Sequence, residues 1–216
     1  MRRAAIGACV LAFGAAGCGA NGIDLAADAR WAKAIVLQRA DLPAFDPQPP
    51  HGSGCLPGHL LGQTAFARSQ RFDSLRQSAA ARAWIFRGET ESKAAFRSLV
   101  RRDYASCLRK PDAGPRILAA HQELFGPRTD DRFRGVRIVV RLAQNGAPLN
   151  VYVDLVFVRR RRTVADIAFT SAGQPFGNAA ESATLLKMTA RMERPPTPDE
   201  DHGRSSLRLP QAPAQA

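Results

Sequence analysis

Three β-rich segments in the C-terminal half, joined by two short connections, constrain the fold more than any other feature of this 216-residue chain. The segments span 133–142, 149–158 and 163–169. The first connection contains Asn145-Gly146, the dipeptide most typical of a two-residue β-hairpin, and the second consists of Arg159, Arg160, Arg161 and Arg162. Consecutive hairpins place neighbouring strands antiparallel, so the sequence predicts a three-stranded antiparallel meander.

The predicted meander needs a hydrophobic cover, because alternation along its central segment places apolar side chains on one face of a sheet. The segments with apolar residues at helical spacing, which are predicted helices, are 25–39, 89–108 and 178–192. A further short helix is expected at 117–125 and a strand over 71–87. The predicted class is therefore α+β: a single domain over residues 24–193, in which an antiparallel sheet with a C-terminal three-stranded meander is covered by helices on one face.

Asp154 interrupts the apolar pattern of the central segment and is the only acidic residue between Asp131 and Asp166. A buried carboxylate of this kind can belong to a catalytic site. On an antiparallel sheet it more often pairs across the hairpin with an arginine, here Arg137 or Arg141. The ion pair is the interpretation that we favour.

Residues 1–17 predict a secretory signal peptide, because a positively charged start precedes an uncharged run that is too short to span a bilayer. The small residues before Cys18 resemble the lipobox of bacterial lipoproteins, which implies lipidation of Cys18 and a lipidated tether over 18–23. Plain secretory cleavage is the alternative, since Ala15 stands where that motif usually has leucine. The expected location is extracytoplasmic, anchored to the cell membrane by lipid or, in the alternative, secreted and soluble.

Cys55 and Cys107 remain for pairing once the signal peptide is removed and Cys18 carries lipid. Two cysteines in an oxidising compartment favour one disulfide, and free cysteines are the alternative. A metal or catalytic site at His51, Cys55 and His59 is disfavoured, because prolines and glycines in that segment prevent a helix that would align the three side chains. The sequence therefore predicts a Cys55–Cys107 bond, with no metal site and no cofactor.

The chain is strongly basic, with 31 Lys and Arg against 19 Asp and Glu and a formal net charge of +12. Only four of the basic residues are lysine, a bias typical of GC-rich codon usage, so the charge by itself is weak support for a polyanionic partner. The run Arg159 to Arg162 has three interpretations: a solvated turn, a contact with anionic lipid or cell-wall polymer, or a nucleic-acid site. Export disfavours nucleic acid, and the N-terminal lipid is the expected contact with the membrane.

The sequence contains no Gly-x-Ser-x-Gly, Ser-x-x-Lys or His-Glu-x-x-His motif and no phosphate-binding glycine loop. We therefore expect that the protein is not an enzyme but a binding, sensing or accessory module of the cell envelope. An envelope hydrolase without a recognised motif is the alternative. Residues 194–216 contain five prolines and no apolar period, which predicts a disordered tail.

Several features together resemble a group of small secreted actinobacterial domains. They are the string Arg39-Ala40-Asp41-Leu42-Pro43, a cysteine in the loop that follows, a strand–helix unit ending at Cys107-Leu108, and the C-terminal meander with its helix. Over residues 24–193 the layout is similar to the extracellular sensor domain of PknH-type kinases and to lipoproteins with a Mog1/PsbP-like sandwich. The resemblance implies a non-enzymatic role in envelope binding or sensing. PknH-type sensors tend to have two disulfides, where this chain can form one.

Overall fold

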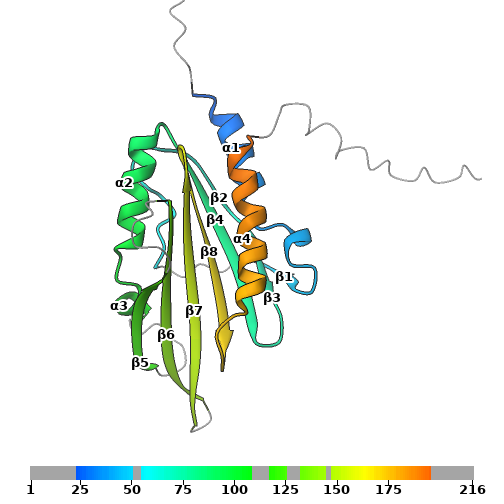
Figure 1. Ribbon diagram of the computed structural model, residues 1–216, viewed down its shortest axis with the longest axis vertical. Coiled ribbons are helices and arrows are strands. Elements are labelled where there is room, and N and C mark those ends of the chain that lie inside the picture. The colour runs from blue at the N-terminus through cyan, green and yellow to red at the C-terminus, as the bar shows by residue number, and fades with distance from the viewer. Residues whose placement is uncertain (1–22, 51–54, 109–116, 126–131, 145–146, 196–216) are drawn as a thin grey trace, which may run out of the picture.

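An antiparallel sheet of eight strands forms the centre of the computed structural model, which describes residues 23–50, 55–108, 117–125, 132–144 and 147–195 (Figure 1). The strands follow the order β1-β3-β4-β8-β7-β6-β5, and β2 also pairs with β4. Their bounds are β1 (Asp46–Gln48), β2 (Gln63–Arg68), β3 (Arg71–Asp73), β4 (Gln77–Phe86), β5 (Ile117–Phe125), β6 (Phe133–Gln144), β7 (Ala147–Arg160) and β8 (Thr163–Ala172). The predicted class, α+β with an antiparallel sheet in a single domain, is confirmed.

The predicted meander is present as β6, β7 and β8, and each strand is longer than its sequence pattern indicates. β6 pairs with β7 along its whole length, and β7 pairs with β8 from Val151 to Arg160. The second connection is correspondingly shorter, because Arg159 and Arg160 belong to β7 and only Arg161 and Arg162 form the turn. The first connection, with Asn145-Gly146, lies outside the described residues.

Four α-helices pack on the sheet: α1 (Leu25–Ile35), α2 (Glu89–Val100), α3 (Tyr104–Leu108) and α4 (Asn178–Glu193). The predicted helices at 25–39 and 178–192 are present, although α1 ends at Ile35 and a 3₁₀ turn, η1, follows at Arg39–Asp41. The helix predicted over 89–108 is divided into α2 and α3. Asp103 explains the division, since its Oδ1 accepts a hydrogen bond from the Ser106 amide at 2.9 Å and so caps a second helix.

Residues 117–125 form strand β5, so the short helix predicted there is wrong. Leucine, alanine, glutamine and glutamate favour a helix locally, but β5 pairs with the edge of β6 from Ile117 to Phe125 and satisfies its backbone there. The strand predicted over 71–87 is also divided, into β3 and β4. The Ser74 amide donates to the Gln77 carbonyl at 2.8 Å and closes the turn between them.

Helices cover both faces of the sheet, whereas the sequence predicts a cover on one face. α1 and α4 pack with one set of strand side chains, including Ala81, Ala83 and Ile85 of β4. α2 and α3 pack with the alternate set, which includes Trp84 and Phe86. Because successive side chains of a strand point to opposite faces, the two cores lie on opposite sides of the sheet. We call these sides the α1/α4 face and the α2/α3 face.

A disulfide joins Cys55 to Cys107, with their Cα atoms 5.7 Å apart, and the predicted bond is confirmed. It ties the segment before β2 to α3 on the α2/α3 face. Because the Cys55 thiol is consumed in this bond, the alternative that made it a metal ligand or nucleophile is wrong. His51 of that alternative lies outside the described residues.

The signal peptide at 1–17, Cys18 with most of its tether, and residues 196–216 of the predicted tail lie outside the described residues. Within the part of the chain that the structure describes, no helix has the length and apolar character needed to cross a membrane.

Candidate functional site

The β7–β8 hairpin brings the arginine run to one end of the sheet. Arg159 and Arg160 are the last residues of β7, and alternation directs their side chains to opposite faces. Arg161 has a backbone φ of 47°, the left-handed region that a two-residue turn commonly requires. Arg161 is exposed, while Arg159 is only 8% exposed, so the run is not uniformly solvated.

Arg162 has a structural role within this run. Its guanidinium donates to the two carboxylate oxygens of Asp28 on α1 at 2.5 and 2.8 Å and to the Phe86 carbonyl at 3.1 Å. It also lies 5.3 Å above the Trp31 ring. Burial acts to raise the pKa of Asp28, but hydrogen bonds from Arg162 and Thr64 outweigh it and hold this pKa below its ordinary value. The turn is thereby fixed to α1.

A cavity of about 530 Å³ opens beside the hairpin, and we call it the arginine cavity. Its lining comes from the β7–β8 hairpin, the residue before β6, the start of α2 and the end of α4: Glu89, Arg132, Arg159, Arg160, Arg161, Met192, Glu193 and Arg194. Five arginines against two glutamates give this lining a formal excess of three positive charges. Arg160 Nε lies 3.7 Å from Glu193 Oε1, which links the two walls. A volume of this size is in the range of roughly 300–1,000 Å³ that small-molecule sites occupy.

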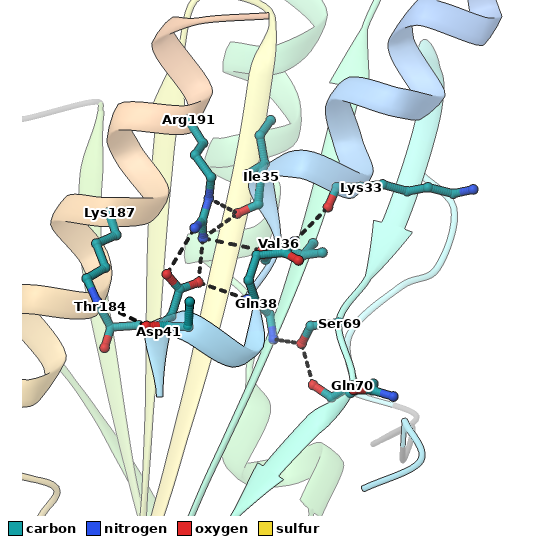
Figure 2. Close-up of polar contacts among 12 residues, drawn as sticks. Lys33, Ile35, Val36, Gln38, Asp41, Ser69, Gln70, Thr184, Lys187 and Arg191 are labelled. Atoms are coloured by element: carbon teal, nitrogen blue, oxygen red, sulfur yellow. Dashed lines mark hydrogen bonds and ion pairs between the residues drawn. The ribbon is translucent and has the colours of Figure 1, made fainter. Parts of the chain in front are cut away.

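The end of α4 that forms one wall of the cavity is clamped by Arg191. Figure 2 shows its guanidinium between Asp41 and the end of α1: it donates to the Asp41 carboxylate at 3.0 and 2.7 Å and to the Ile35 carbonyl at 3.2 Å. Arg191 in turn accepts a hydrogen bond at its carbonyl from Trp31 Nε1 at 3.1 Å. Burial opposes ionisation of Asp41, yet Arg191 and the Gln38 amide keep its pKa below the ordinary value. The cavity wall is therefore held by a charged pair that stays ionised near neutral pH.

Three of the four arginines singled out from the sequence, Arg159, Arg160 and Arg161, line the arginine cavity, and Arg162 anchors the turn instead. The remaining lining residues come from three other segments, namely the start of α2, the residue before β6 and the end of α4, so no local pattern connects them with the hairpin. Arg194, the first residue of the predicted tail, gave no signal of its own. Only the folded arrangement of α2, α4 and the hairpin brings these charges together.

Asp154 pairs with Arg137, as the favoured interpretation predicts: Arg137 donates from Nε to Oδ1 at 2.7 Å and from an Nη to Oδ2 at 2.8 Å. The surroundings differ from expectation, because Asp154 is fully buried beneath α4 rather than on an open face. Glu181 of α4 contacts the same carboxyl. Burial, and then repulsion by Asp154, raises the pKa of Glu181 to about 7.

A second buried pair, Arg82 with Asp166, lies on the α2/α3 face. Their closest contact, from an Arg82 Nη to Asp166 Oδ2, is 3.5 Å. Within the described residues Asp166 Oδ1, Arg82 Nε and Trp84 Nε1 have no hydrogen-bond partner. Burial raises the pKa of Asp166 to about 7, although Arg82 and Arg68 act to lower it.

Comparison with solved structures supports a shared fold. The chain is similar to the extracellular domain of PknH from Mycobacterium tuberculosis, with a TM-score of 0.50 and 12% sequence identity over 77% of this chain and 97% of that one. A Pseudomonas aeruginosa protein of unknown function, PA94, described as a putative regulator, matches with a TM-score of 0.25 and 14% identity over 66% of this chain and 90% of its own, which is too low to support an argument. No protein-family model and no curated protein matches the sequence. The fold is therefore that of an α+β domain like the PknH extracellular domain, in agreement with this part of the resemblance.

Proposed function

We propose that this protein is an exported, lipid-anchored and non-enzymatic binding module of the cell envelope, and that its arginine cavity binds the phosphate of an anionic lipid headgroup. The cavity carries the proposal, since its lining has a formal excess of three positive charges. Guanidinium groups bind phosphate oxygens through paired, charge-assisted hydrogen bonds, which makes arginine suited to this ligand.

The position of the cavity supports a membrane ligand. Arg162 of the hairpin binds Asp28 of α1, and Asp28 lies ten residues after Cys18. Figure 1 shows the start of α1, the β7–β8 hairpin and the C-terminal end of α4 at the same end of the domain. A tether of the predicted length reaches roughly 20 Å when extended, so a lipid on Cys18 would keep this end near the headgroups.

Export is supported by two independent features. The signal-like N-terminus with Cys18 is one, and the Cys55–Cys107 bond is the other, because disulfides persist in oxidising compartments. The shared fold with an extracellular domain agrees with this location. Mass spectrometry of the membrane fraction tests the anchor: we expect a mature N-terminus at Cys18 carrying acyl chains, and a mature N-terminus elsewhere would contradict it.

Vesicle cosedimentation tests the cavity. The mature chain with Cys18→Ser, which removes the lipid, is compared with a double variant, Arg161→Gln with Arg194→Gln, since both side chains are exposed lining residues. With about 1 kcal/mol per basic residue near an anionic surface, we expect roughly 30-fold weaker binding to phosphatidylglycerol vesicles at low salt.

The matched control is Arg97→Gln with Arg101→Gln, which removes the same charge from exposed positions towards the other end of α2. This control should retain most of the binding. Equal binding by both double variants would overturn the cavity as the site. Loss of binding to cell-wall polymer alone, with vesicle binding unchanged, would replace the lipid with a wall ligand.

A further inference from the structure

The N-terminal part of α4 packs over a buried ion pair of the sheet and places a carboxyl group of its own beside it. Asp154, in the middle of β7, is 0% exposed, and Glu181, in the first turn of α4, is 7% exposed. Arg137 of β6 uses two donors on Asp154, at 2.7 and 2.8 Å. The carboxyl of Glu181 is hydrogen-bonded to that of Asp154, and Glu181 Oε1 is buried with no partner within the described residues.

The charges of this cluster balance only if it holds a proton. Two ionised carboxylates and one guanidinium would leave a net negative charge in a buried site, which is costly. A hydrogen bond between two carboxyl groups also needs a proton on one of them. Glu181 is the group that takes it, because burial and then the neighbouring Asp154 raise its pKa from the ordinary 4.5 to about 7. The start of the helix favours an ionised glutamate by only about 0.3–1 kcal/mol, too little to reverse this.

We propose that the Asp154–Glu181 pair makes α4 a pH-sensitive wall of the arginine cavity: α4 is docked tightly while the pair shares a proton, and loosens when the proton leaves. The docking of α4 is strongest in acid. It weakens as the pH rises from the ordinary pKa of a free glutamate to the raised pKa of Glu181, and it stays weakened above that value. The link to ligand binding rests on the function proposed above.

The other charged groups near α4 do not provide the same response. On the element packed against its C-terminal half, Asp41 binds Arg191, and Lys187 Nζ donates to the Ala40 carbonyl at 3.4 Å. Glu193 lies beside Arg160 of β7. On β5, the register places His121 and Glu123 on the same face as Arg137, further from α4. Asp166 of β8 belongs to the opposite face.

α4 connects this pair to the cavity directly. The helix is continuous from Asn178 to Glu193, and its last turn contributes Met192 and Glu193 to the cavity lining, followed by Arg194. Trp31 reports on this end, because its indole donates to the Arg191 carbonyl at 3.1 Å. The chain has two tryptophans, and the other, Trp84, belongs to the opposite face.

The first test follows Trp31 fluorescence in a Trp84→Phe chain from ~pH 4 to ~pH 9. We expect a change in emission with a midpoint near 7, abolished by Glu181→Gln, which keeps the shape of the protonated side chain. Glu193→Gln, on the same helix, and Asp166→Asn, on the other face, should leave the change in place. A pH response that persists unchanged in Glu181→Gln would overturn the inference.

Hydrogen exchange provides a measurement that does not depend on the Trp84→Phe chain folding. Exchange of the α4 amides is compared between wild type and Glu181→Gln at the same pH, so that the intrinsic pH dependence of exchange cancels. We expect the wild-type amides to exchange about tenfold faster than those of the variant at ~pH 8, and at nearly equal rates at ~pH 4. Equal rates at both values would overturn the inference.

Vesicle binding separates this inference from the proposed function. Wild type should bind phosphatidylglycerol vesicles several-fold more weakly at ~pH 8 than at ~pH 6, and Glu181→Gln should show a smaller difference. If Trp31 responds but vesicle binding has the same pH dependence in both chains, the regulation of the cavity is overturned. If no vesicle binding occurs at any pH, the proposed function fails, while the Trp31 and exchange results still decide whether the pair controls α4.

Discussion

The two faces of the sheet contain buried arginine–carboxylate pairs of unequal quality. On the α1/α4 face, Arg137 makes two hydrogen bonds to Asp154, at 2.7 and 2.8 Å. On the α2/α3 face, Arg82 and Asp166 make a single contact at 3.5 Å and leave polar atoms of both side chains without a partner within the described residues. Two short hydrogen bonds compensate for the cost of burying the charges of the first pair, whereas the single long contact of the second pair compensates for much less of that cost.

This difference between the two ion pairs parallels the way in which the helices are attached to each face of the sheet. On the α1/α4 face, charged contacts fix the helices: Arg162 holds Asp28 of α1, and Arg191 of α4 holds Asp41. On the α2/α3 face, the disulfide and apolar packing do so, including the stacked rings of Tyr104 and Phe157 with centroids 6.0 Å apart. The ionic contacts of the α1/α4 face respond to pH, whereas a covalent bond and apolar packing do not.

Removing the disulfide should have the largest effect. Cys55→Ala with Cys107→Ala opens a loop whose ends are 52 residues apart, which corresponds to about 4 kcal/mol in the chain-entropy model. Urea denaturation measures this free energy of unfolding, and wild type under reducing conditions is the control, expected to lose a similar amount. A loss below about 1 kcal/mol would show that apolar packing alone holds the α2/α3 face.

Removing both carboxylates of the α4 cluster should come next. Asp154→Asn with Glu181→Gln removes both buried carboxylates beside Arg137 and leaves only Glu123 of β5 near it, and we expect a loss of about 2–3 kcal/mol, since that guanidinium is one-quarter exposed. Asp154→Asn alone should cost less, because an ionised Glu181 can replace the lost partner. Equal losses in the single and double variants, measured by urea denaturation, would show that Glu181 does not share the site.

Asp166→Asn should behave in the opposite way and stabilise the protein at high pH. The native state favours protonated Asp166, whose pKa is raised to about 7, so wild type loses stability as pH rises from the ordinary value of 3.8 towards 7. The amide removes this loss, and we expect a gain of about 1–2 kcal/mol at ~pH 8 and none at ~pH 4. Thermal unfolding across this range measures it, and a destabilised variant at ~pH 8 would mean that Arg82 needs the carboxylate.

The smallest effect on stability is expected at the turn between β7 and β8. Arg161→Gly places glycine where φ is 47°, and relief of that strain should stabilise by about 0.5 kcal/mol. Arg162→Gly at the next position should destabilise instead, because it removes both hydrogen bonds to Asp28. Thermal unfolding of the two variants compares them directly, and the same change in both would show that Arg162 is only a solvated turn residue.

Local sequence pattern determined several parts of this protein without the structure. The meander follows from period-two alternation and short connections, and α1 and α4 follow from the spacing of their apolar residues. The Cys55–Cys107 bond follows from having two cysteines outside the predicted signal and lipidation site. In each case the prediction depends on a few neighbouring residues or on the number of cysteines, so it does not require knowledge of the folded structure.

Only the tertiary structure decided the rest. Residues 117–125 became a strand because the edge of β6 was open to pair with them, and helices cover both faces because the sheet is apolar on both. Arg162 and Asp28 are 134 residues apart in the chain, and Arg191 and Asp41 are 150 apart. No local pattern connects such residues, since an ion pair depends on distance in space, and the arginine cavity exists only because the packed sheet and helices bring its charges together.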